Sequence, residues 1–257
     1  MIRMENVSMR FGGLYALNDV SFEINEGELF SIIGPNGSGK STLFNVITGV
    51  YSPSNGNIFL QNQKITGMPP SKLNHIGMAR TFQSPRIFND ITVLENVMIP
   101  LLAKSNVPLF SEIINKKRQE REYENLKPVA LNALEVTGLL DKENQNASKL
   151  SYGDQKRLEI ARCFAISPKI ILLDEPVAGL NKEERESINN LAKSLNETGI
   201  TILLIEHDMK MVMGISDRIM VLNYGKKVAL GNPKEISNNP EVIKAYLGVE
   251  ESDDGTA

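Results

Sequence analysis

The sequence contains no tryptophan, a single cysteine and two histidines among its 257 residues. The one cysteine, Cys163, excludes an internal disulfide, which suits a reducing compartment. The net charge is only −3, so the overall balance does not favour nucleic acid as a partner. The longest apolar runs, such as 170–173 and 200–205, have strand length and fall far short of the ~20 residues of a membrane-spanning helix. We therefore expect any membrane role to depend on a partner protein.

What the chain does contain is a glycine-rich stretch between a predicted strand and a predicted helix. Residues 29–33 are apolar and β-prone, residues 34–42 fit the pattern G-x-x-x-x-G-K-[ST], and residues 43–47 begin a helix. The glycines let backbone N–H groups surround an anion, and the helix N-terminus adds partial positive charge. Lys40 supplies a full charge for the β- and γ-phosphates, and Ser41 offers a hydroxyl to Mg²⁺. The pattern predicts a nucleotide phosphate site made by Asn36, Gly37, Ser38, Gly39, Lys40, Ser41 and Thr42.

Polar side chains follow two further runs that are predicted to be buried strands. Asp174 and Glu175 come directly after 170–173, and His207 comes shortly after 201–205. Because ligands bind at the carboxyl ends of parallel strands, these residues are placed to meet the phosphates. Asp174 can then reach Mg²⁺, and Glu175 can orient or deprotonate a water that attacks the γ-phosphate. Two acids at a strand end can also cap a helix, which is the alternative for this pair.

Two candidate residues are ambiguous when each is considered alone. Phe11 lies among glycines upstream of the phosphate loop, where its ring could stack on a purine base; on spacing alone it could equally be a core residue. Gln83 ends a strand predicted over 76–83 and would ordinarily be a surface residue. The charged stretch 115–124 carries both signs, so it favours a solvated helix face over a nucleic-acid patch.

The order of the patterns predicts an α/β protein with a helical insertion. Pro128 is expected to start or kink a helix, and Ser151 is expected to cap the next helix together with Asp154 in a capping-box-like pair. The predicted parts are an α/β core over 1–91 and 161–231 with an N-terminal antiparallel β region, a helical subdomain over 92–160, a C-terminal helix over 232–249, and a disordered acidic tail over 250–257, all in one domain spanning 1–257.

Taken in order, these motifs resemble those of the ATP-binding subunit of ABC transporters over nearly the whole chain. The resemblance assigns Phe11 to adenine stacking, 34–42 to the phosphate loop, Gln83 to the Q-loop, 150–155 to the signature motif, Asp174 to the second nucleotide motif, Glu175 to the catalytic glutamate, 178–181 to the D-loop and His207 to the switch histidine. The signature departs from the usual L-S-G-G-Q, because Tyr152 replaces the first glycine and Asp154 the glutamine. The family fold is a P-loop NTPase core with a mostly parallel sheet.

Four segments, 11–14, 80–83, 157–162 and 178–181, are similar to importers of branched-chain amino acids. ATPases of lipopolysaccharide export share several of these features. The alternatives to import are therefore an ATPase of another ABC system, such as lipopolysaccharide export, or a soluble ABC ATPase that drives no transport.

The resemblance implies a head-to-tail pair of ATPase subunits, either a homodimer or a heterodimer of related chains. ATP would lie between the phosphate loop of one chain and Ser151 and Gly153 of the other. Mg²⁺ would be held by Ser41, Gln83 and Asp174, and the catalytic residues would be Glu175, His207, Gln83 and Lys40. The expected partners are transmembrane permease subunits and indirectly a solute-binding protein. Residues 86–88 are candidates for the docking surface, and ordinary loop packing is the alternative for them. The expected location is the cytoplasmic face of the cell membrane.

Overall fold

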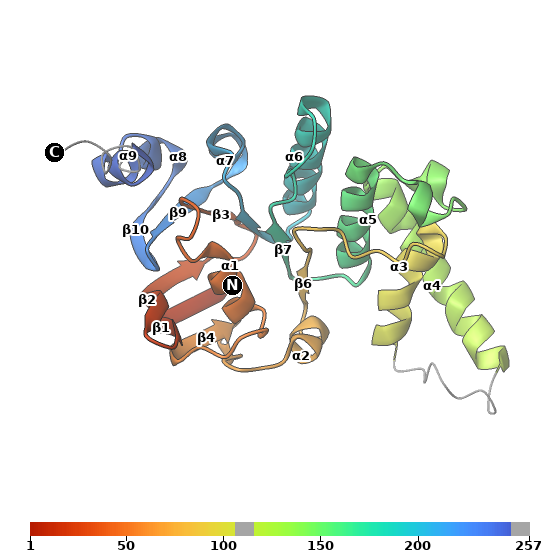
Figure 1. Ribbon diagram of the computed structural model, residues 1–257. Helices are drawn as coiled ribbons and strands as arrows, with labels where there is room; N and C mark the ends of the chain where they lie inside the picture. Colours follow the sequence, from red (N-terminus) through yellow and green to blue (C-terminus); the bar gives the residue numbers. More distant parts are fainter. Residues whose placement is uncertain (106–115, 248–257) are drawn as a thin grey trace.

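The computed structural model describes residues 1–105 and 116–247, and its centre is a six-stranded sheet with the order β10-β9-β3-β8-β7-β6 (Figure 1). Every neighbouring pair is parallel except β10 with β9. The strands are β3 (Leu29–Ile33), β6 (Met78–Arg80), β7 (Ile170–Asp174), β8 (Thr201–Ile205), β9 (Arg218–Asn223) and β10 (Lys226–Gly231). The strand predicted over 76–83 is thus only the short β6.

The three central strands explain the runs of apolar residues in the sequence. Every residue of β3, β7 and β8 is buried. Alternate residues face two hydrophobic clusters, so that Ile171 and Leu173 pack with the helices of one face while Ile170 and Leu172 pack with α1 (Lys40–Ile47) on the other. Parallel strands that are covered on both faces bury every side chain, so their sequences are almost continuously apolar instead of alternating with polar residues.

A second, antiparallel sheet with the order β2-β1-β4-β5 packs beside the first, across α1 (Figure 1). The rings of Phe22 on β2 and Phe30 on β3 stack with centroids 5.6 Å apart, which joins the two sheets. The predicted antiparallel β region is therefore present. Its strands are β1 (Ile2–Phe11), β2 (Leu14–Ile24), β4 (Asn55–Leu60) and β5 (Gln63–Lys64), and α2 (Pro70–His75) leads from it to β6.

Three helices, α3, α4 and α5, pack together at one end of the molecule (Figure 1). Thr92 and Glu95 form a complete capping box at the start of α3. α4 runs through Pro128, so this residue does not start a helix, and the other expectation, that it kinks one, stays a prediction. Within the described residues, no helix is both long and apolar enough to cross a bilayer. The elements are α3 (Val93–Lys104), α4 (Lys116–Val136), α5 (Tyr152–Ala165), and the single-turn helices Leu140–Lys142 and Ala147–Lys149.

The C-terminal part differs from the single helix predicted over 232–249. The chain forms two helices, α8 (Pro233–Ser237) and α9 (Pro240–Leu247), which follow the β9–β10 hairpin. Pro240 has no N–H to continue the first helix but suits the first turn of a second one. Residues 248–249 and the predicted tail 250–257 lie outside the described residues. The remaining helices are α6 (Lys182–Glu197) and α7 (Met209–Ile215).

Candidate nucleotide site

The phosphate loop connects β3 to α1, and two of its glycines lie where no side chain fits. A Cβ at Gly34, which has φ 154°, would come within 2.0 Å of the Leu222 carbonyl oxygen. A Cβ at Gly39, which has φ 105°, would come within 2.5 Å of the Ala16 carbonyl oxygen. The loop is therefore pressed against β2 and β9 and keeps its curvature only with glycine. The Ser38 hydroxyl is buried inside it with no hydrogen-bond partner among the described residues.

Lys40, the first residue of α1, is bent back over this loop. Its Nζ donates to the carbonyl oxygens of Gly34 at 2.6 Å and Pro35 at 3.0 Å. Burial lowers the pKa of the Lys40 ammonium, and the charge of Glu175 partly offsets that shift. An ammonium held by neutral carbonyls and an unsatisfied serine hydroxyl both suit an anion such as a phosphate.

The loop forms one wall of a hollow of about 430 Å³, a size that accommodates a nucleotide. Leu14, Tyr15 and Glu175 line it together with the loop. Phe11 is not among the lining residues; the residue is 46% exposed, and its ring meets that of Tyr51 edge-on with centroids 5.5 Å apart. Adenine stacking on Phe11 stays a prediction, and the structure adds Tyr15, which the sequence patterns did not single out.

Glu175 and Gln83, which lie 92 positions apart in the sequence, are in direct contact. The Gln83 side-chain amide donates to a Glu175 carboxylate oxygen at 2.9 Å. The backbone of Glu175 has a positive φ of 44°, and its N–H donates to the Ile205 carbonyl oxygen at 3.0 Å. The strained backbone turns the carboxylate out of the sheet and into the hollow.

Asp174, the last residue of β7, is paired with an arginine that the sequence patterns did not assign to the site. The Arg80 guanidinium donates to the Asp174 carboxylate at 2.8 Å. It also donates to Asn45 at 2.7 Å and to Thr48 at 2.9 Å, and its carbon lies 5.5 Å from the centre of the Phe44 ring. Arg80 therefore fixes the candidate Mg²⁺ ligand from the side of β6.

The residues after β8 bring His207 to the same edge of the sheet. Its side chain is 61% exposed, and Nδ1 lies 3.8 Å from the carboxylate of the buried Glu206. That carboxylate accepts hydrogen bonds from the backbone N–H groups of Val177 and His207, each at 3.2 Å. Burial raises the pKa of Glu206, although these hydrogen bonds oppose the shift.

At the signature segment, the structure shows what the unusual Asp154 does. Ser151 caps α5 as predicted and accepts from the Asp154 N–H at 3.2 Å. The Asp154 carboxylate does not complete a capping box; it pairs with Lys142 at 2.6 Å and lies 3.7 Å from Arg157. Its charge is thereby neutralised within the helical region. Neither Ser151 nor Gly153 lines the hollow at Lys40 in the same chain.

Together, these features define the nucleotide-binding cassette of a P-loop ATPase. The chain belongs to the ABC transporter family, since the model of that name matches residues 17–178 and a second model, the branched-chain amino acid ATP-binding cassette transporter, matches 226–252. The expected family and the P-loop α/β fold are confirmed, and the chain is an ATPase subunit of this class.

Named relatives and solved structures agree with the family models over almost the full length. The chain is 47% identical to the high-affinity branched-chain amino acid transport ATP-binding protein LivG of Escherichia coli over 96% of this chain and 98% of LivG. It is 43% identical to BraF of Pseudomonas aeruginosa over the same shares. The ADP conformation of MJ1267, an ATP-binding cassette of an ABC transporter, superposes with a TM-score of 0.85 at 36% identity over 96% of this chain and 98% of that one.

Proposed function

We propose that this chain hydrolyses ATP to power the import of branched-chain or related amino acids across a membrane. The observation that carries the proposal is the second family match, over residues 226–252, because it covers a segment outside the nucleotide motifs and belongs to branched-chain amino acid cassettes. The full-length similarity to LivG and BraF, which are named for that transport, supports it. Lipopolysaccharide export and a soluble ABC ATPase remain the alternatives.

In this proposal, Glu175 orients and deprotonates the attacking water, and Gln83 holds the Glu175 carboxylate through the hydrogen bond described above. Lys40 exchanges the loop carbonyls for phosphate oxygens, and His207 contacts the γ-phosphate or the water. Mg²⁺ would be held by Ser41, Gln83 and Asp174 and would supply charge neutralisation on the phosphates. The small number of protein ligands fits Mg²⁺, which keeps waters and phosphate oxygens in its shell.

A second ATPase subunit is part of the proposal, because one chain supplies only part of the site. Ser151 caps α5 and Gly153 lies in its first turn, and neither lines the hollow that contains Lys40. A head-to-tail partner would place the corresponding helix end over the nucleotide of this chain. A cassette of related sequence, MJ0796, has been solved as a dimer and matches this chain at 32% identity with a TM-score of 0.76.

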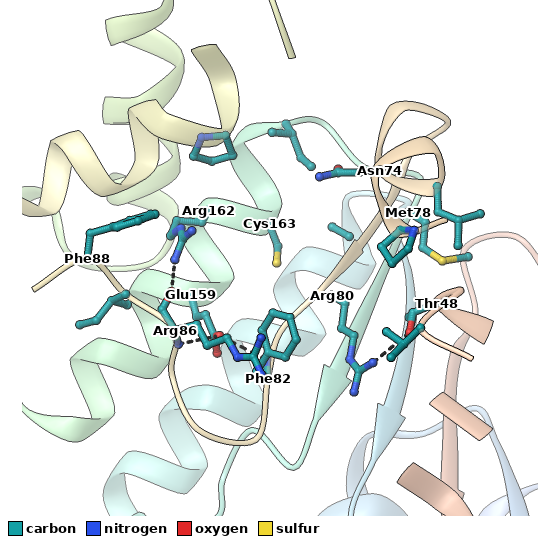
Figure 2. Close-up of a pocket in the computed structure, with 17 residues that line it drawn as sticks. Thr48, Asn74, Met78, Arg80, Phe82, Arg86, Phe88, Glu159, Arg162 and Cys163 are labelled. Carbon is teal, nitrogen blue, oxygen red and sulfur yellow. Dashed lines mark hydrogen bonds between the residues drawn. The ribbon is translucent and has the colours of Figure 1, made fainter. Parts of the chain in front are cut away.

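A permease would dock in a groove of about 660 Å³ between the α2–β6 region and α5 (Figure 2). Phe88, at its rim, is 47% exposed and lies under the Arg162 guanidinium at 5.3 Å from the ring centre. Glu159 holds the groove's loop by accepting from the backbone N–H groups of Phe82 and Arg86. The mainly apolar lining suits a helix of a permease, which would place the chain at the cytoplasmic face of the membrane. A solute-binding protein would then act on the far side.

Uptake by vesicles containing the chain and the permease encoded beside it tests this function. Labelled leucine should enter only with ATP, and Glu175→Gln should bind ATP normally but lower turnover at least 100-fold. Phe88→Ala should weaken permease binding more than tenfold, whereas Leu140→Ala, at another exposed apolar residue, should leave it unchanged. Binding to ribosomes, lipopolysaccharide transport, or ATP-independent uptake would each contradict the proposal.

A further inference from the structure

Lys156, in the second turn of α5, is a buried cation that none of the nucleotide motifs includes. Its residue is only 2% exposed. Its Nζ donates to the Gln83 carbonyl oxygen at 2.5 Å and to the Glu175 carbonyl oxygen at 3.4 Å. One ammonium therefore touches three segments: the signature helix, the loop after β6, and the end of β7.

Burying an ammonium costs free energy unless hydrogen bonds and opposite charges compensate for it. The groups around Lys156 therefore indicate which part of the structure it stabilises. Burial lowers the pKa of Lys156, while the charges of the four surrounding acids oppose that shift; in decreasing order these are Glu159, Glu206, Asp174 and Glu175. The ammonium thus lies between Glu159 on its own helix and the carboxylates at the carboxyl ends of β7 and β8. Its direct hydrogen bonds go to backbone carbonyls instead, which fixes the path of the main chain.

Lys156 holds the main chain of both Gln83 and Glu175, the two residues whose side chains are hydrogen-bonded to each other. Glu175 adopts a positive φ of 44°, an unfavourable conformation for this residue type. Its N–H is held by Ile205 and its side chain by Gln83. The Glu175 carbonyl accepts from the Ala178 N–H at 3.2 Å and from the Lys156 ammonium at 3.4 Å, and the same ammonium holds the carbonyl of Gln83.

Tyr152, which replaces the first glycine of the usual signature, lies one turn before Lys156 and near its ammonium. The Lys156 Nζ lies 5.7 Å from the centre of the Tyr152 ring. The same ring lies against Gly179, where an added Cβ would meet it at 3.3 Å. Tyr152 therefore covers the ammonium on one side and contacts the segment after Glu175 on the other.

We propose that Lys156 is a positioning residue for ATP hydrolysis, which sets the backbone of Gln83 and Glu175 so that the carboxylate meets the attacking water. The inference rests on the proposed role of Glu175. It links the signature helix to the hydrolytic carboxylate inside one chain, without contact between Lys156 and the nucleotide.

The test is steady-state ATP hydrolysis by the purified full-length chain. Lys156→Met should lower kcat more than tenfold, because the Glu175 carboxylate loses its position. The KM for MgATP should change less than threefold, because Lys156 does not contact the nucleotide in this proposal. Lys156→Arg should regain at least a third of the activity, and Lys193→Met, at an exposed position on α6, should match the wild type. Lys156→Met in the Glu175→Gln background should cause no further loss, because the group that it positions is already disabled.

A kcat for Lys156→Met within twofold of the wild type would overturn the proposal, as would a loss that appears in KM alone. Thermal unfolding followed by circular dichroism checks that each variant is folded. If Lys156→Met does not fold, Lys156→Gln can be used, because its side chain is polar but uncharged; wild-type kcat for that variant also refutes the idea. Full turnover by Glu175→Gln would instead refute the proposed role of Glu175, so the two failures are distinguishable.

Discussion

Replacing Arg80 by methionine should destabilise the folded chain strongly, because it removes the only cation within hydrogen-bond reach of the Asp174 carboxylate in the described residues. The two side chains are 13% and 10% exposed, so the pair is largely shielded from water. Arg80→Met keeps most of the aliphatic stem against Phe44 but removes the hydrogen bonds to Asp174, Asn45 and Thr48.

The loss in the free energy of unfolding depends on the Asp174 charge that Arg80→Met leaves without a partner. Removing one partner of a buried ion pair costs about 3–5 kcal/mol, chiefly because a buried charge is left uncompensated. Some exposure remains at Asp174, so we expect a loss of about 3 kcal/mol in the free energy of unfolding. Arg3→Met is the matched control, since the Arg3–Glu5 pair has side chains that are 44% and 43% exposed and should contribute at most about 1 kcal/mol.

Urea unfolding without nucleotide measures both losses, with Asp174→Asn as the second arm of a double-mutant cycle. Arg80→Met should lose much less stability in the Asp174→Asn background, because no charge is then left unpaired. MgATP should stabilise Arg80→Met by more than it stabilises the wild type, since the metal ion supplies positive charge near Asp174. A loss below 1 kcal/mol, or equal losses in both backgrounds, would show that the pair contributes little.

Two further predictions concern the phosphate loop and the groove. Gly34→Ala should weaken ATP binding more than tenfold in equilibrium titration, because its Cβ would overlap the Leu222 carbonyl; Gly27→Ala, at a turn with open space, should leave the affinity unchanged. Burial raises the pKa of Glu159 above its ordinary 4.5, so the ionised form costs stability as the pH rises through that raised value. Glu159→Gln, which keeps the oxygen that accepts from Phe82 and Arg86, should therefore be more stable than the wild type at pH 8 in urea unfolding, and this advantage should shrink toward pH 5.

The parts of the fold that the sequence predicted correctly are those with local signals. The buried strands appear as continuous apolar runs, and the phosphate loop appears as a spacing of glycines with a lysine. The N-cap of α5 is likewise encoded within four residues, Ser151 to Asp154. The capping box predicted for the Asp154 carboxylate did not form, because that carboxylate pairs with Lys142, which lies in the single-turn helix Leu140–Lys142.

The positions of Arg80 and Lys156 in the site could not be predicted from local sequence signals. Arg80 reaches an acid 94 positions away, and Lys156 reaches a carbonyl 73 positions away, so neither contact leaves a spacing pattern. An arginine in a strand or a lysine in a helix is ordinarily a surface residue. Only the packing of α5 and β6 around the end of β7 shows that both charges are buried.

Two cations of the site, Lys40 and Arg80, also bear on how the site binds a phosphate. The Lys40 ammonium donates to the carbonyls of Gly34 and Pro35, and Asp174 is paired with Arg80. An arriving phosphate therefore replaces two neutral acceptors of Lys40 with charged ones, which form stronger hydrogen bonds, and the loop backbone can stay in place. In the proposed site, phosphate binding at Lys40 therefore requires an exchange of hydrogen-bond acceptors rather than a new path for the loop.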